Sequence, residues 1–64
     1  MSYREITKIL TKHGCYLVRE GAGSHKIWFS PITGKKFPIQ NHKGKDIPLG
    51  TVRKIQKQSG VKLL

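Results

Sequence analysis

A glycine-rich segment, Gly21-Ala22-Gly23-Ser24, separates two β-rich runs and most constrains the fold of this 64-residue chain. One run covers residues 16–18, and the other covers residues 26–29. β-Branched and aromatic residues favour extended backbone, whereas glycine and serine favour tight turns. The pattern therefore predicts a β-hairpin, with His25 at the point where the turn enters the second strand.

A helix is predicted before this hairpin and a third strand after it. Ser2 and Glu5 have the spacing of a capping box, and apolar residues at helical spacing then predict a helix over residues 3–13. A turn at residues 31–34 leads into a strand at residues 35–40. Pro38 restricts that strand to an edge of the sheet or leaves one side of it unpaired.

A second helix is predicted from Pro48, which suits a first helical turn, to Gly60. Apolar residues at helical spacing, among them Val52 and Ile55, support it. The expected fold is therefore α+β with the order αβββα, in which a three-stranded antiparallel sheet carries two helices on one face. We expect a single domain over residues 1–64.

The charge of the chain points to a polyanionic partner. It has 13 Lys and Arg residues against 3 Asp and Glu residues, a formal net charge of +10 at pH 7. Such a surface attracts nucleic acid. Two-metal nucleases and glycosidases need clustered carboxylates, which this composition disfavours. We expect no metal and no other cofactor.

Cysteine usage and hydropathy predict a cytoplasmic protein. Cys15 stands alone, so it has no internal disulfide partner and is expected to be a small buried residue. No segment has the pattern of a secretory signal or the length of a membrane span. We expect neither secretion nor membrane insertion.

Several segments together carry a resemblance to a known family. They are Gly23-Ser24-His25, the aromatic Trp28 on the following strand, Asn41-His42-Lys43-Gly44-Lys45-Asp46-Ile47-Pro48, and Gly50-Thr51-Val52-Arg53-Lys54-Ile55. In these segments the chain resembles the HicA toxins, over nearly its whole length. The resemblance implies a fold similar to a double-stranded-RNA-binding domain and the role of toxin in a type II toxin–antitoxin system. It further implies cleavage of mRNA, arrest of translation, neutralisation by a HicB-type antitoxin, and a catalytic histidine at His25.

The chemistry of His25 is consistent with that role. An imidazole with a pKa near 6.5 accepts and donates protons near neutral pH. A base that takes the proton of a ribose 2′-hydroxyl lets the RNA attack its own phosphate, without a metal or a covalent enzyme intermediate. The structural alternative places His25 at the rim of the sheet, on the strand face of Ile27 and Phe29. A non-catalytic RNA-binding module of the same fold is the alternative function.

A set of polar, basic and aromatic residues is predicted to contact RNA: Ser24, Lys26, Trp28, His42, Lys43, Lys45, Arg53 and Lys57. For Trp28, packing in the core or against an antitoxin is the favoured alternative. For His42, loop-shaping hydrogen bonds compete with a phosphate contact. Lys26, Lys43, Lys45 or a backbone N–H near Gly23 could stabilise charge on the phosphate oxygens, and His42, Tyr16 or water could protonate the leaving group.

A second basic stripe lies on the first predicted helix. Arg4, Lys8 and Lys12 follow one another at helical spacing, and like charges so placed weaken an isolated helix slightly. The stripe suggests an anionic partner or a solvated face. A DNA-binding regulator is the remaining alternative function, but three strands separate the two helices, which does not fit a helix-turn-helix.

Overall fold

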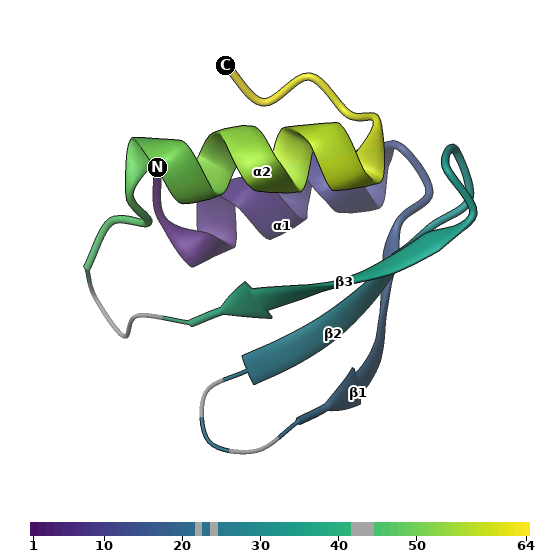
Figure 1. Ribbon diagram of the computed structural model, residues 1–64, viewed down its shortest axis with the longest axis horizontal. Helices are drawn as coiled ribbons and strands as arrows, with labels where there is room; N and C mark the ends of the chain where they lie inside the picture. The colour runs from purple at the N-terminus through teal and green to yellow at the C-terminus, as the bar shows by residue number, and fades with distance from the viewer. Residues whose placement is uncertain (22, 24, 42–44) are drawn as a thin grey trace.

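The computed structural model describes residues 1–21, 23, 25–41 and 45–64. The elements follow the order α1 (Tyr3–Lys12), β1 (Tyr16–Glu20), β2 (His25–Ser30), β3 (Lys35–Gln40) and α2 (Leu49–Ser59). The strands form one antiparallel sheet in the order β1-β2-β3, and both helices lie on one side of it (Figure 1). The predicted αβββα fold is confirmed.

The first helix begins with the predicted capping box. The Glu5 backbone N–H donates to the Ser2 hydroxyl at 3.1 Å, and the Ser2 backbone N–H donates to the Glu5 carboxylate at 3.1 Å. These bonds satisfy amides that a helix start leaves without partners. The pKa of Glu5 is lowered from its ordinary value of 4.5, mainly by the hydrogen bond from the Ser2 backbone N–H and to a smaller extent by the Ser2 hydroxyl.

The central strand β2 fixes the register of the sheet. On one side of β2, Lys26 pairs with Glu20 of β1. Toward the turn that joins them, β1 extends two residues beyond its predicted run and β2 extends one residue beyond its own. On the other side Ile27 pairs with Pro38 and His25 pairs with Gln40. β3 is an edge strand, which confirms the restriction that Pro38 predicted.

The two faces of the sheet differ in burial. The core face carries Trp28, Phe37 and Ile39, which pack with the apolar residues of both helices, Ile6, Leu10, Val52 and Ile55. The other face, which we call the open face, consists by register of Tyr16, Arg19, His25, Ile27, Phe29, Lys36, Pro38 and Gln40. None of these eight side chains is buried.

Helix α2 is fastened to the sheet at its C-terminal end. The buried Ser30 hydroxyl donates to the Ser59 carbonyl at 2.5 Å, and the Thr33 hydroxyl donates to the Gln58 carbonyl at 2.7 Å. Gly60 ends the helix at a φ of 72°, and a Cβ there would lie 2.9 Å from the Ile32 side chain. The turn between β2 and β3 therefore sets where α2 lies against β3.

No helix within the described part of the chain is long and apolar enough to cross a membrane.

Candidate functional site

His25 is the first residue of the central strand, and its backbone is held on both sides. The Gly21 N–H donates to the His25 carbonyl at 2.8 Å and closes the β1–β2 turn, while Gln40 pairs with His25 across the sheet. Gly23 in that turn has a φ of 64°, which glycine adopts without steric cost. The imidazole is exposed. A rigid strand end therefore presents an accessible imidazole.

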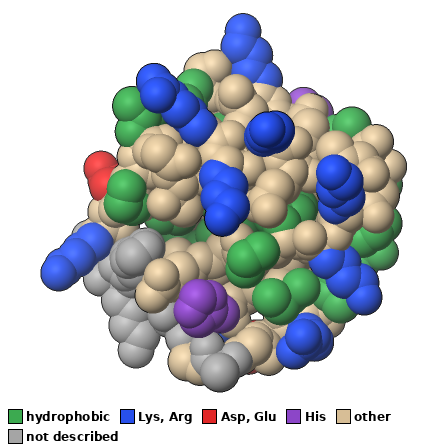
Figure 2. Space-filling model, viewed as in Figure 1, with side chains coloured by type: hydrophobic (Ala, Val, Ile, Leu, Met, Phe, Trp, Pro, Cys, Tyr) green, Lys and Arg blue, Asp and Glu red, His purple; other side chains and the backbone are tan. Residues whose placement is uncertain are grey.

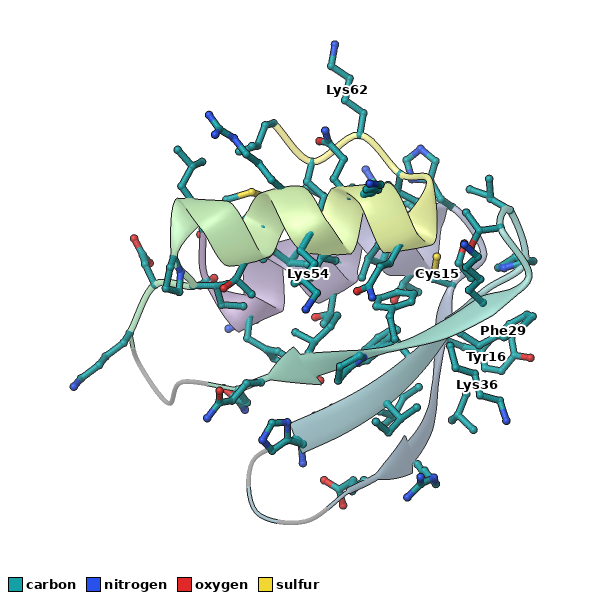
Figure 3. The ribbon with its side chains drawn as sticks, in the orientation of Figure 1. Cys15, Tyr16, Phe29, Lys36, Lys54 and Lys62 are labelled. Carbon is teal, nitrogen blue, oxygen red and sulfur yellow. The ribbon has the colours of Figure 1, made fainter. Side chains whose placement is uncertain are left out.

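A pocket of about 180 Å³ lies at the β3 edge of the sheet, where residues of the open face come close to α2. The sheet contributes His25, Pro38 and Gln40 to it, and α2 contributes Thr51, Lys54, Ile55 and Gln58. In Figure 3 the Lys54 side chain extends from α2 toward β3. Since pockets for drug-sized ligands have volumes of about 300–1,000 Å³, this one is suited to a small group such as a ribose or a phosphate.

The polar groups of this pocket complement a phosphodiester. The Lys54 ammonium is a cation that can pair with phosphate oxygens, and the side chains of Gln40, Thr51 and Gln58 offer hydrogen-bond donors. The imidazole of His25 is a group that can accept a proton. The pocket therefore combines a proton acceptor with an anion-binding side chain.

The surface around the pocket is basic. Figure 2 shows Lys and Arg side chains spread over the side of the molecule that α2 and β3 present, with acidic side chains hardly in view. Of the three acids in the chain, Glu20 forms an ion pair with Lys26 and Glu5 belongs to the capping box. Among the described residues, no three His, Cys, Asp or Glu side chains come together as a metal site.

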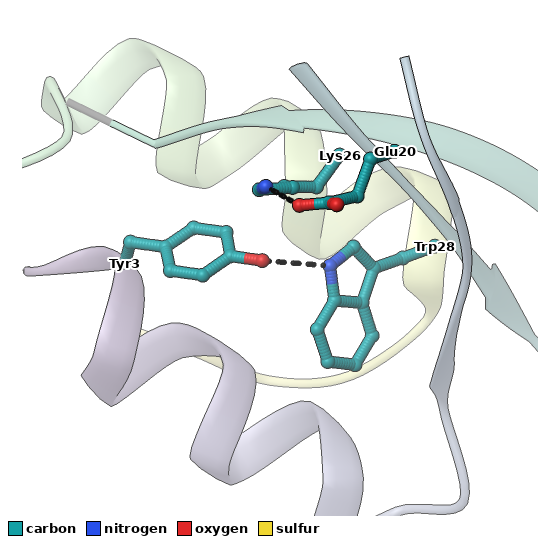
Figure 4. A network of polar contacts seen from close by, with 4 residues as sticks. All are labelled: Tyr3, Glu20, Lys26 and Trp28. Atoms are coloured by element: carbon teal, nitrogen blue, oxygen red, sulfur yellow. Dashed lines mark hydrogen bonds and ion pairs between the residues drawn. The ribbon is translucent and has the colours of Figure 1, made fainter. Parts of the chain in front are cut away.

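Two of the predicted RNA contacts, Trp28 and Lys26, lie on the core face. Trp28 is 7% exposed, and its indole N–H donates to the Tyr3 hydroxyl at 3.2 Å (Figure 4). No face of this ring is free to stack on a base, so Trp28 is corrected to a core role, in agreement with the packing alternative. Lys26 pairs with Glu20 and does not line the pocket of His25.

The other predicted contacts are dispersed. Lys45 lies beside Ser2, Arg4 and Asn41 at a separate pocket. Arg53 and Lys57 are exposed on α2 but do not line the pocket of His25. Ser24, His42 and Lys43 fall outside the described residues. Contacts between these six residues and RNA stay predictions.

Sequence reasoning missed the α2 wall of the pocket. Thr51, Lys54 and Gln58 follow one another at helical spacing, at the margin of the buried stripe that includes Val52 and Ile55. That spacing places them on one side of the helix. The sequence does not show which strand this side of α2 packs beside, so it does not predict that Thr51, Lys54 and Gln58 share a pocket with His25.

Three further residues have clear structural positions. His13 caps the end of α1, where its Nδ1 lies 3.0 Å from the Ile9 carbonyl, in keeping with a stabilising role. Cys15 is 2% exposed, as expected for a small core residue. Tyr16 pairs with Phe29 at the end of β2 remote from His25, so it does not face the pocket as a proton donor.

The fold and the site define a small, strongly basic αβββα protein with an exposed histidine on the rim of an anion-complementary pocket. The family model described as "HicA toxin of bacterial toxin-antitoxin" matches residues 3–61. The chain therefore belongs to the HicA toxin family, whose role is that of the toxin in a toxin–antitoxin pair. Neither the search of curated proteins nor the search of solved structures found a match.

Proposed function

We propose that this HicA toxin is a metal-independent endoribonuclease that cleaves mRNA, with His25 as the group that moves the proton. The observation that carries the proposal is the exposed imidazole at the rim of a pocket that also contains Lys54. The net charge of +10 supports RNA as the substrate, because it attracts a polyanion to the whole surface.

In the proposed reaction His25 accepts the proton of a ribose 2′-hydroxyl. The 2′-oxygen forms a bond to the adjacent phosphorus, and the bond from phosphorus to the 5′-oxygen of the next nucleotide breaks. That 5′-oxygen takes a proton from water or from the imidazolium of His25. The products are a 2′,3′-cyclic phosphate and a 5′-hydroxyl, so no redox partner or co-reactant is needed.

Lys54 is the proposed partner of His25 in this reaction. Negative charge accumulates on the non-bridging phosphate oxygens as the 2′-oxygen attacks, and a cation held beside them lowers the barrier. Lys54 lines the same pocket as His25 from the opposite wall, whereas Lys26 is paired with Glu20. The geometry favours Lys54 over Lys26 and Lys45, the two described lysines that the sequence suggested for this purpose.

The cellular consequence is arrest of translation through loss of mRNA. The antitoxin of the pair is proposed to be a HicB-type protein whose acidic surface covers His25 and its basic surroundings. Such a partner would block the pocket and neutralise the charge that recruits RNA.

The test is cleavage of an end-labelled RNA by purified protein, with His25→Ala compared with wild type. We expect the rate to fall by about 10²–10⁴-fold, the usual contribution of a general base. His13→Ala is the matched control, because His13 is an exposed histidine that does not line the pocket. Thermal melting of each variant shows whether it is folded.

Two further measurements sharpen this test. A DNA strand of the same sequence lacks the 2′-hydroxyl and should stay intact, and EDTA should not change the rate of RNA cleavage. Retained cleavage by folded His25→Ala protein would overturn the proposal. RNA binding without any cleavage by the wild-type protein would instead favour the non-catalytic RNA-binding module.

A further inference from the structure

Two aromatic rings lie together on the open face, outside the core. The centroids of Tyr16 and Phe29 are 5.4 Å apart with an angle of 44° between the rings, and Tyr16 is 55% exposed. The other aromatic side chains, Tyr3, Trp28 and Phe37, belong to the core or pack against it. Tyr16 is exposed and Phe29 is half-buried, and neither ring belongs to the hydrophobic core that the other aromatic side chains form.

Basic side chains flank this aromatic pair. Lys36 pairs with Phe29 in the register of β3, and Arg19 pairs with Ile27 in the register of β1. In Figure 3 Tyr16, Phe29 and Lys36 lie together at one end of the sheet. Glu20 lies opposite Lys26, on the core side, so the open face as described carries no acidic side chain.

The aromatic pair and the imidazole lie on one continuous strand face. His25, Ile27 and Phe29 alternate along β2, which places His25 and Phe29 about 13 Å apart at the usual rise per residue. Ile27 and Pro38 pair with each other between the two ends. Apolar side chains therefore connect the aromatic end of the open face to the pocket.

We propose that the open face is a stacking platform for single-stranded RNA, a proposal that rests on the function proposed above. Bases stack on Tyr16 and Phe29, while Lys36 and Arg19 pair with the backbone phosphates. The strand then continues along β2 and delivers a phosphodiester to His25. Stacking on exposed rings beside cations is a general way to hold single strands without reading their sequence.

A single strand fits this face better than a duplex does. The bases of a duplex already stack on one another inside the helix, so they are not accessible for stacking on Tyr16 and Phe29. Duplex RNA is instead held through its backbone and its minor groove. The cations and rings of the open face match a strand whose bases are free.

The test measures binding separately from cleavage. A fluorescent single-stranded oligoribonucleotide with 2′-O-methyl groups has no free 2′-hydroxyl, and its fluorescence anisotropy reports affinity alone. Tyr16→Ala and Phe29→Leu are each expected to weaken binding by about 5- to 150-fold, the range for removal of one stacked base. Leu17→Ala, which alters an exposed neighbour on the other face of β1, should leave binding unchanged.

A second matched pair tests the cations. Lys36 and Lys35 are adjacent exposed residues of β3, but register places Lys36 on the open face and Lys35 on the other. Lys36→Ala should weaken binding more than Lys35→Ala. With wild-type protein, abasic positions in the oligonucleotide should lower affinity, and an RNA duplex should bind more weakly than the single strand.

Several outcomes would overturn this proposal. They are unchanged affinity of folded Tyr16→Ala and Phe29→Leu proteins, equal affinity for abasic and normal oligonucleotides, and loss of antitoxin binding alone in these variants. The proposed function fails separately, if His25→Ala still cleaves RNA. The wild-type comparison of abasic and normal strands needs no variant, so it decides the question even where a substitution disturbs folding.

Discussion

The outer surface of α1 and the open face of the sheet are both basic, but they offer a ligand different chemistry. A shallow pocket of about 490 Å³ on α1 is lined by Arg4, Thr7, Lys8, Thr11 and Lys12. The threonine hydroxyls there already donate to the helix backbone, Thr7 to the Arg4 carbonyl at 3.2 Å and Thr11 to the Thr7 carbonyl at 2.7 Å. The α1 surface therefore provides mainly positive charge.

The open face adds an imidazole and the ring pair Tyr16–Phe29 to its cations, and at the β3 edge its residues and those of α2 line a pocket of about 180 Å³. The larger of these two pockets, on α1, thus offers fewer kinds of functional group than the smaller one. The difference teaches that charge alone accounts for attraction of a polyanion. The proposed cleavage also needs a scissile bond held in place, and for this the small pocket offers a cation on α2 and a proton acceptor on β2.

After the loss of His25, the largest expected effect separates the pocket side of α2 from the rest of that helix. Lys54→Ala should slow RNA cleavage by about 10- to 100-fold at saturating RNA, since removal of a group that stabilises transition-state charge commonly costs this much or more. Lys57→Ala removes a cation from the same helix, outside the pocket, and should leave that rate within about twofold. Single-turnover cleavage measures both. Equal rates for the two variants would remove Lys54 from the mechanism.

A smaller effect is expected on the α1 surface. The double variant Lys8→Gln and Lys12→Gln should weaken RNA binding a few-fold at low salt while the rate at saturating RNA is unchanged. For a single strand, the slope of log K against log[salt] should become shallower by about 0.7 for each phosphate that the variant no longer neutralises. Titrations at several salt concentrations measure this slope. A fall in the saturated rate would show that α1 does more than attract RNA.

The smallest effect on activity is expected at the N-cap of α1, which lines neither of the two pockets just compared. Ser2→Ala removes the capping hydroxyl and should lower the free energy of unfolding by about 1 kcal/mol. Because the pKa of Glu5 is lowered in the folded protein, its contribution is present above pH 4.5 and disappears as the pH falls through the folded pKa. Ser2→Ala keeps the Ser2 backbone N–H, which is the first cause of the lowered pKa, so thermal melts of both proteins should shift down in acid while most of the difference between them persists. Cleavage at neutral pH should stay unchanged.

The sequence predicted those parts of the molecule that local chemistry determines. Ser2 and Glu5 specified the helix start, and Pro38 predicted that β3 lies at an edge of the sheet or has one side unpaired, of which the edge is observed. Trp28 and Lys26 were placed on one strand face correctly, but alternation does not say which face the helices cover. Packing decided which face is buried, and it gave Trp28 a place in the core instead of a contact with RNA.

The candidate site was only half predictable for a related reason. His25 stood out because a glycine turn precedes it, a signal contained within a few residues. Lys54 comes from a helix far along the chain, and it reaches the pocket because Ser30 and Thr33 fasten the end of α2 against the sheet. Such long-range placement has no local pattern that distinguishes Lys54 from Arg53 or Lys57.

The attachment of α2 to the β2–β3 turn has a consequence for the order in which the pocket is completed during translation. Ribosomes complete the hairpin that holds His25 before they make residues 49–60, which supply Lys54 and the carbonyls that Ser30 and Thr33 bind. A nascent chain that has emerged only as far as β3 carries the imidazole with nothing opposite it. In the proposed reaction Lys54 is the partner of His25, so a nascent chain of this length is expected to leave the mRNA under translation uncut until α2 has emerged.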